Sequence, residues 1–169
     1  MASPLDNGSR WSTLAVTLFA LGVLGLAAGQ APALALINES PSLPRGLYAR
    51  ASGAPDLGVI VAVAPPAGAA AYLAGLGAAP DVLLLKRVRA GAGDMVCSEG
   101  DLVWTPAGAL PVSERDRRGA SLPQWRDCRA LEGDEVFLTG DTPTSFDSRY
   151  FGPVRTDRLR GVYREVVSW

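Results

Sequence analysis

Near its start the chain carries an apolar stretch that is long enough to cross a bilayer. No charged residue occurs from Trp11 to Leu36, and Trp11–Gly29 is almost continuously hydrophobic. Nineteen helical residues at ~1.5 Å each reach ~28 Å, which spans a hydrocarbon core. Pro32 then disfavours continuation of the helix. The pattern therefore predicts a transmembrane helix.

This segment divides the chain into three parts. We predict a cytoplasmic tail over 1–10, a transmembrane anchor over 11–30, and an extracytoplasmic domain over 31–169. A cleavable signal peptide is the alternative, since small residues such as Ala31 and Ala33 follow the apolar run.

Beyond the anchor, the hydrophobic positions come in short runs separated by Gly, Pro and Asp. Such runs indicate β-strands joined by turns, and the Ala-rich segment 67–76 between Pro66 and Gly77 indicates one short helix. We therefore predict a single, mainly β domain after the transmembrane helix. The expected strands are Val59–Val63, Val82–Val88, Met95–Cys97, Leu102–Trp104, Val136–Thr139 and Val162–Val167.

Composition excludes several classes of function. The net charge of −1 provides no basic field for nucleic acid. The absence of histidine excludes a Ser-His-Asp triad, a Cys-His pair and a histidine-ligated metal, and two cysteines cannot form a four-cysteine zinc site. We expect neither a metal nor a cofactor.

One lysine, Lys86, stands among fifteen arginines. Arginine cannot lose its proton in a protein, whereas a desolvated lysine can and then acts as a base. Lys86 is therefore a candidate catalytic base. Its chance retention in an arginine-rich chain is the alternative.

Both cysteines follow the predicted membrane span, which suits an oxidising compartment. We predict a disulfide between Cys97 and Cys128, and closing this loop would stabilise the fold by about 3–4 kcal/mol. Two buried free thiols in a cytosolic domain are the alternative.

Three further segments carry candidate chemistry. In Asn38–Tyr48 (NESPSLPRGLY), Pro41 and Pro44 bracket Ser42 and stiffen its backbone. Leu83–Asp94 (LLLKRVRAGAGD) holds Lys86, and Gly140–Gly152 (GDTPTSFDSRYFG) is rich in turn residues. Taken singly, these segments also fit a Pro-rich linker, a lysine that reaches solvent from a strand end, and an ordinary turn.

Together and in this order, the three segments resemble the motifs of the S26 signal peptidase family. The Ser-Leu-Pro-x-Gly-x-Tyr spelling and the cysteine pair are closest to the TraF-type peptidases of conjugative plasmid transfer. Ala90 and Ala92 depart from the usual Gly and Pro of signal peptidases, and 142–144 (TPT) replaces their Asn-Arg-Asp. The resemblance covers about residues 11–160 and implies a signal-peptidase-like antiparallel β domain.

The resemblance also implies roles for individual residues. Ser42 would be the nucleophile and Lys86 its general base, with the Ser42 backbone N–H and the Ser40 hydroxyl forming the oxyanion hole. Ser145 would orient the Lys86 amine. Asp147 and Arg149 would pair to hold their loop, although an acidic residue is implicated more directly in the conjugative branch, so the role of Asp147 stays open.

The implied function is maturation of a membrane-tethered precursor, such as a conjugative pilin, with hydrolysis or cyclisation as the outcome. The enzyme would lie in the inner membrane with its catalytic domain in the periplasm, beside conjugation or secretion machinery. Alternatives are a general type I signal peptidase and an inactive membrane-anchored scaffold of a secretion complex. A soluble self-cleaving repressor of the LexA type would lack the membrane span. The arginine-rich segment 115–118 is expected to be a solvated loop.

Overall fold

The computed structural model describes residues 33–169. Leu34–Trp169 form one compact unit. The predicted tail and transmembrane anchor lie outside the described residues. Within 33–169 there is no helix with the length and apolar character that a membrane crossing requires.

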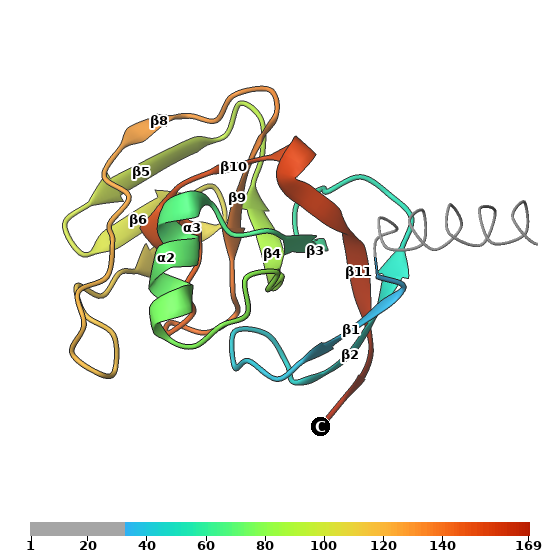
Figure 1. Ribbon diagram of the computed structural model, residues 1–169. Coiled ribbons are helices and arrows are strands. Elements are labelled where there is room, and N and C mark those ends of the chain that lie inside the picture. Colours follow the sequence, from blue (N-terminus) through green and yellow to red (C-terminus); the bar gives the residue numbers. More distant parts are fainter. Residues whose placement is uncertain (1–32) are drawn as a thin grey trace, which may run out of the picture. The chain divides into compact units, whose positions relative to one another are not determined.

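The domain is mainly antiparallel β-structure with one short helix, as the sequence predicted (Figure 1). Its larger sheet has seven strands in the order β1-β2-β11-β3-β4-β9-β10. Every pairing in this sheet is antiparallel. The strands are β1 (Ala35–Asn38), β2 (Gly46–Ala51), β3 (Ile60–Val63), β4 (Leu84–Ala90), β9 (Glu135–Thr139), β10 (Val154–Arg155) and β11 (Leu159–Ser168).

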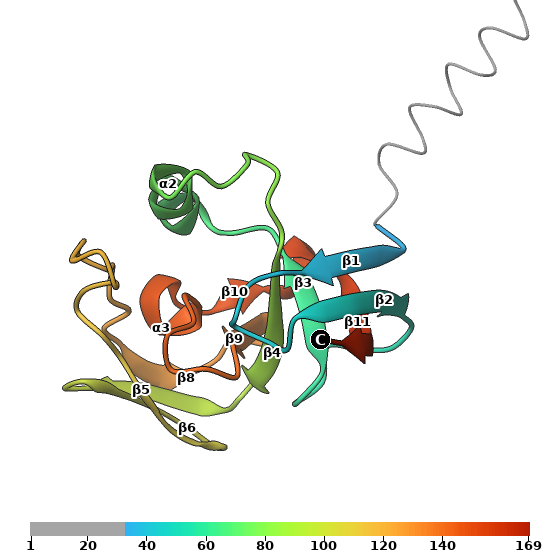
Figure 2. The ribbon, with the colours of Figure 1, turned by 90° about the horizontal axis from the view of Figure 1, so that it is seen from below.

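A smaller sheet of four strands lies apart from β1 and β2 (Figure 2). Its order is β7-β6-β5-β8, formed by β5 (Met95–Glu99), β6 (Leu102–Thr105), β7 (Gly108–Pro111) and β8 (Cys128–Ala130). Cys97 and Cys128 are directly opposed across β5 and β8, and the predicted disulfide joins them.

The expected helix is α2 (Ala67–Gly75), which begins after Pro66. Gly77 follows with a φ of +86°, a left-handed conformation that favours glycine and stops the helix. Two short helical elements were not predicted: α3 (Ser148–Phe151), a single turn capped by the Asp147 side chain, and the 3₁₀-helix η1 (Thr156–Arg158).

One hydrophobic cluster holds the two segments that carry the candidate nucleophile and base. Leu43, next to Ser42, and Leu85, next to Lys86, are both buried in it with Tyr48 and Tyr163. Burial of these side chains fixes the backbone on which the polar neighbours sit. The core thus determines the position of the candidate site.

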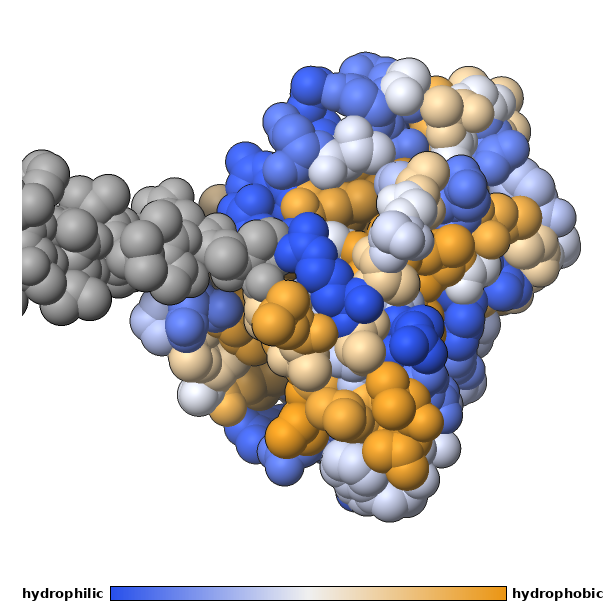
Figure 3. Space-filling view, turned by 90° about the vertical axis from the view of Figure 1, so that its right-hand side faces the viewer, coloured by the Kyte–Doolittle hydropathy of each residue, from blue (hydrophilic) through white to orange (hydrophobic). Residues whose placement is uncertain are grey.

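Apolar residues also gather on the surface formed by β1, β2 and β11. Figure 3 views the molecule from this side and shows hydrophobic residues over much of the face. Ile37, Leu47 and Val167 are paired in register across the three strands, and Ile37 and Val167 are exposed.

Candidate active site

Ser42 lies in the turn between β1 and β2, and the Asn38 side chain holds this turn closed. The Asn38 amide nitrogen lies 3.0 Å from each of the carbonyl oxygens of Ser40, Leu43 and Pro44, and donates to them. Asn38 is buried, so these bonds are shielded from water. The turn is therefore fixed before any ligand binds.

Ser42 and Ser40 face each other within this turn. Their hydroxyl oxygens are 2.6 Å apart, and the Ser42 backbone N–H donates to Ser40 Oγ over 3.2 Å. Ser42 is only 5 % exposed. Both of the oxyanion donors expected from the family resemblance are thus engaged with one another.

Lys86 lies on β4 and is 3 % exposed. Its ammonium donates to Ser145 Oγ over 2.9 Å. Burial lowers the pKa of Lys86 to about 8, because the charged amine is desolvated, while the nearby Asp147 carboxylate partly opposes this effect. A minority of Lys86, about a tenth at pH 7, is therefore neutral near physiological pH.

Gly140 brings the serine turn and the lysine's partner together. The Ser42 carbonyl accepts from the Asp141 N–H over 2.6 Å. A Cβ at Gly140 would lie 2.3 Å from Ser145 Oγ and 2.6 Å from the Ser42 carbonyl oxygen. Both groups border the same small space, which only glycine leaves open. Ser42, Ser145 and Lys86 therefore belong to one cluster.

A buried ion pair holds the loop that carries Ser145. Arg149 Nε donates to Asp147 Oδ1 over 2.8 Å, and both side chains are at most 1 % exposed. Asp147 Oδ2 accepts from the Gly140 N–H, while Arg149 donates to the carbonyl oxygens of Pro143 and Ser145. Because both Asp147 oxygens are occupied, the pair acts as a structural clamp on this loop.

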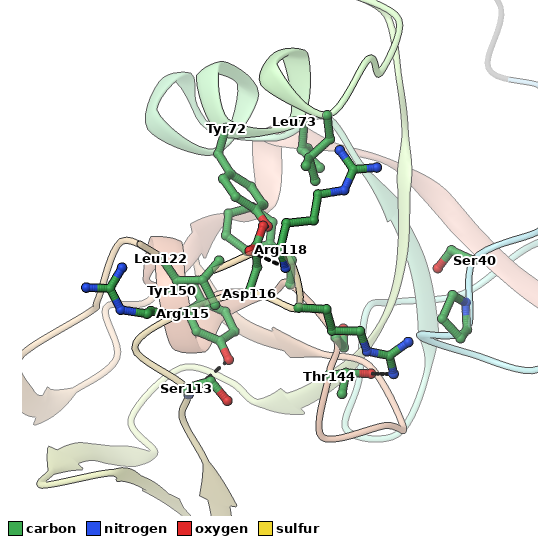
Figure 4. A pocket seen from close by; sticks show the side chains of 15 residues that line it. Ser40, Tyr72, Leu73, Ser113, Arg115, Asp116, Arg118, Leu122, Thr144 and Tyr150 are labelled. Atoms are coloured by element: carbon green, nitrogen blue, oxygen red, sulfur yellow. Dashed lines mark hydrogen bonds between the residues drawn. The ribbon is translucent and has the colours of Figure 1, made fainter. Parts of the chain in front are cut away.

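A pocket of about 500 Å³ opens beside the cluster (Figure 4). Ser40 and Ser145 line it, and α2 and the loop 113–122 form much of its wall. The Tyr72 ring of α2 packs against the Phe146 ring in a tilted arrangement, with the ring centroids 4.5 Å apart, which ties the helix to the loop of Ser145. The cavity therefore leads to Ser40, one hydrogen bond from the Ser42 hydroxyl.

The structure thus brings together six of the eight residues singled out in the sequence. Lys86, Ser145, Asp147 and Arg149 form connected contacts. Ser40 and Ser42 bond to each other and join this group through the backbone N–H groups of Gly140 and Asp141, whereas the disulfide lies in the smaller sheet. Within residues 33–169, Cys, Asp and Glu side chains form no group of three suited to a metal ion.

Sequence reasoning missed three contributors. Asn38 and Gly140 lie inside the recognised motifs, but the family resemblance implies no role for either residue. The arginine-rich segment 115–118 is exposed, as expected of a solvated loop, but it also lines the pocket. The segment is distant in sequence from Ser42 and Lys86, so the sequence alone offered no sign that it lines the pocket.

Comparisons with known proteins agree on a family. The family model for signal peptidase, peptidase S26, matches residues 9–169. Two plasmid transfer proteins TraF of Escherichia coli are 34 % and 36 % identical, covering 91 % and 80 % of this chain and 94 % and 84 % of theirs. The conjugal transfer protein TraF of Agrobacterium fabrum is 31 % identical over 88 % of this chain and 94 % of its own length.

Among solved structures, a signal peptidase I of Enterococcus faecalis is 21 % identical with a TM-score of 0.42, covering 66 % of this chain and 98 % of its own. The extent of the family match decides the assignment. The chain belongs to the signal peptidase family, peptidase S26.

Proposed function

We propose that this protein is a serine endopeptidase in which Ser42 is the nucleophile and Lys86 the general base. Membership of the family implies a serine peptidase. The observation that carries the finer proposal is the buried environment of the chain's only lysine, whose pKa falls to about 8 and whose amine contacts Ser145 beside the Ser42 turn.

The proposed reaction begins with proton transfer. A neutral Lys86 amine accepts the proton of Ser42 Oγ as that oxygen attacks the scissile carbonyl carbon. The lysine then returns the proton to the departing amine, leaving an acyl-enzyme on Ser42. With a pKa of about 8, about a tenth of the molecules hold the neutral base at pH 7.

The oxyanion of the tetrahedral intermediate requires hydrogen-bond donors. The Ser42 N–H and the Ser40 hydroxyl are suitable donors. In the free protein the Ser42 N–H donates to Ser40 Oγ, and the two hydroxyl groups share one hydrogen bond in which either can donate. Substrate binding would exchange these contacts for the developing oxyanion. Such a donor typically contributes about 3 kcal/mol to the stabilisation of the transition state.

Asp147 and Arg149 take a positioning role in this proposal. Their ion pair fixes the Ser145 carbonyl and the Gly140 N–H, and so holds the Ser145 hydroxyl against Lys86. Ser145 in turn orients the amine toward the serine turn. Direct proton transfer by Asp147 is disfavoured because Arg149 and backbone N–H groups occupy its oxygens.

The substrate we propose is a membrane-tethered precursor in conjugative transfer, such as a pilin. The named relatives are plasmid and conjugal transfer proteins. The exposed apolar side chains of Ile37, Val167 and Trp169 fit a domain that works at a membrane surface. We propose the inner membrane, with the domain on the periplasmic side.

The test uses the full chain in detergent micelles and a purified pilin precursor. Ser42→Ala and Lys86→Arg should each abolish processing, because arginine keeps the charge but cannot accept a proton. Mass measurement of the product distinguishes hydrolysis from cyclisation, since the cyclic product weighs one water less than the cleaved linear chain. Processing by Lys86→Arg at a rate near that of the unmodified enzyme would refute the dyad.

A further inference from the structure

The pocket beside the proposed nucleophile has an unusual excess of positive charge. Arg115, Arg117 and Arg118 line it, and Asp116 supplies the only carboxylate among its lining residues. None of the three guanidinium groups forms an ion pair within residues 33–169. This part of the wall therefore offers guanidinium groups outside any ion pair, of which Arg118 interacts electrostatically with the nearby Asp116 carboxylate.

The Asp116 carboxylate stabilises the loop 113–122 through hydrogen bonds. Its Oδ2 accepts from the Tyr72 hydroxyl of α2 over 2.9 Å, and its Oδ1 accepts from the backbone N–H groups of Arg118 and Ala120. The hydrogen bond from the Leu122 N–H to the Glu114 carbonyl closes the loop further. The arginines are therefore presented on a backbone that is already ordered.

The side chains of Arg115, Arg117 and Arg118 point in different directions. Arg117 donates to Thr144 Oγ1 over 3.3 Å, which places it next to the loop of Ser145. Figure 4 shows Arg118 extending toward Leu73 of α2, while Arg115 points to the side away from Ser40. Arg115 also donates to the Gly119 carbonyl. Arg117 thus borders the loop of Ser145, and Arg118 borders α2 on another side of the same pocket.

The remaining wall fits a short extended peptide. Leu73, Leu122 and Phe146 supply apolar surface, and Ser40 connects the pocket to the Ser42 hydroxyl. A cavity of about 500 Å³ holds a few residues of chain but no folded domain. A guanidinium can bind a carboxylate through two parallel hydrogen bonds, which gives the contact directional specificity.

We propose that Arg117 and Arg118 form a specificity subsite that binds a carboxylate of the substrate close to the scissile bond, with an apolar side chain seated against α2. This inference rests on the proposed peptidase function. The carboxylate belongs either to an Asp or Glu side chain or to the free carboxyl terminus of the precursor. The shared chemistry is one anionic group within reach of the acyl-transfer site.

The test uses short peptides with a central Ala-Ala bond, in which a single Glu or Gln is scanned across the other positions. Each peptide is made with a free and with an amidated carboxyl terminus. The enzymes are the full chain, Arg117→Gln, Arg118→Gln, the double variant and, as a matched control on the same loop, Arg115→Gln. The readout is kcat/KM for each peptide, with added salt expected to weaken the preference.

We expect the unmodified enzyme to favour one class of carboxylate peptide by about tenfold over the matching Gln or amide peptide, and the double variant to lose that preference. Arg115→Gln should retain it. A preference that follows the Glu position identifies a side chain, and one that follows the free terminus identifies the terminal carboxylate. Equal cleavage of all peptides by the unmodified enzyme, or a preference that survives in the double variant, would overturn the proposal.

Peptide binding to Ser42→Ala separates this proposal from the proposed catalysis. Tighter binding of the carboxylate peptides, lost on adding Arg117→Gln and Arg118→Gln, supports the subsite even if no peptide is cleaved. Cleavage by Ser42→Ala would instead refute the nucleophile assignment alone. If the double variant loses only its binding to phosphatidylglycerol vesicles, and peptide preference is unchanged, the loop is a lipid contact and the peptide proposal is wrong.

Discussion

Replacing Lys86 by methionine should change the stability of the fold in a way that depends on pH. The two side chains are similar in length and volume, and Lys86 is almost fully buried. The pKa of the lysine falls from 10.5 in the unfolded chain to about 8 in the folded protein because burial disfavours the charge. Methionine removes this cost of burial.

The sign follows from proton linkage. The unfolded chain holds the proton more tightly than the folded protein, so the lysine-containing fold gains stability as pH rises from about 8 to 10.5. The cost of burying the amine is about 3 kcal/mol at pH 6 and falls to about 1 kcal/mol at pH 10. Loss of the hydrogen bond to Ser145 offsets about 1 kcal/mol of the gain in the variant.

Lys86→Met should therefore be about 2 kcal/mol more stable than the unmodified protein at pH 6, and of similar stability at pH 10. The assay is denaturant unfolding followed by tryptophan fluorescence at a series of pH values. Groups common to both proteins cancel in the difference. A difference in unfolding free energy that stays constant across pH 6 to 10 would show that folding does not shift the lysine pKa, and would refute the reasoning.

Three further predictions follow from other contacts. Asp147→Asn should destabilise the fold by about 3–5 kcal/mol, because it leaves Arg149 charged and buried. The control Arg155→Gln, at the exposed ion pair with Asp134, should cost less than about 1 kcal/mol. Equal melting temperatures of the two variants would contradict this prediction. Gly140→Ala should abolish processing, because the new Cβ displaces Ser145 and the Ser42 turn, while Gly133→Ala, which meets no atom within 4 Å, should be active. Replacing both cysteines by alanine should lower stability by about 3–4 kcal/mol, and reductant should then have no further effect, unlike in the unmodified protein.

The hydrophobic pattern predicted the central strands well because their apolar runs are buried on both sides. β3 and β9, for example, are almost wholly buried. β7, β8 and β10 were missed, since β7 contains Gly and Pro, β8 has only three residues and β10 only two. β1 and β2 were also missed, because β1 continues the uncharged stretch that starts at Trp11 and β2 mixes exposed and buried positions without a long apolar run.

The candidate site divides in the same way. Ser42, Lys86 and Ser145 could be singled out because each sits in a short motif with a recognisable spelling. The closure of the serine turn by Asn38 and the tight approach at Gly140 arise from tertiary contacts that no local pattern encodes. The arginine-rich segment 115–118 likewise could not be placed from the sequence, because only the fold brings Arg117 next to Thr144.

The central claim is that a neutral Lys86 activates Ser42, and the pH dependence of acylation tests it most directly. The measurement is the single-turnover rate of acyl-enzyme formation on the full chain, from pH 6 to 10, with chemistry shown to be rate-limiting. We predict an acylation rate that rises about tenfold per pH unit at low pH and levels off above about pH 8, where most of the buried amine is neutral. An acylation rate that does not change with pH over this range would contradict the assignment of Lys86 as the base.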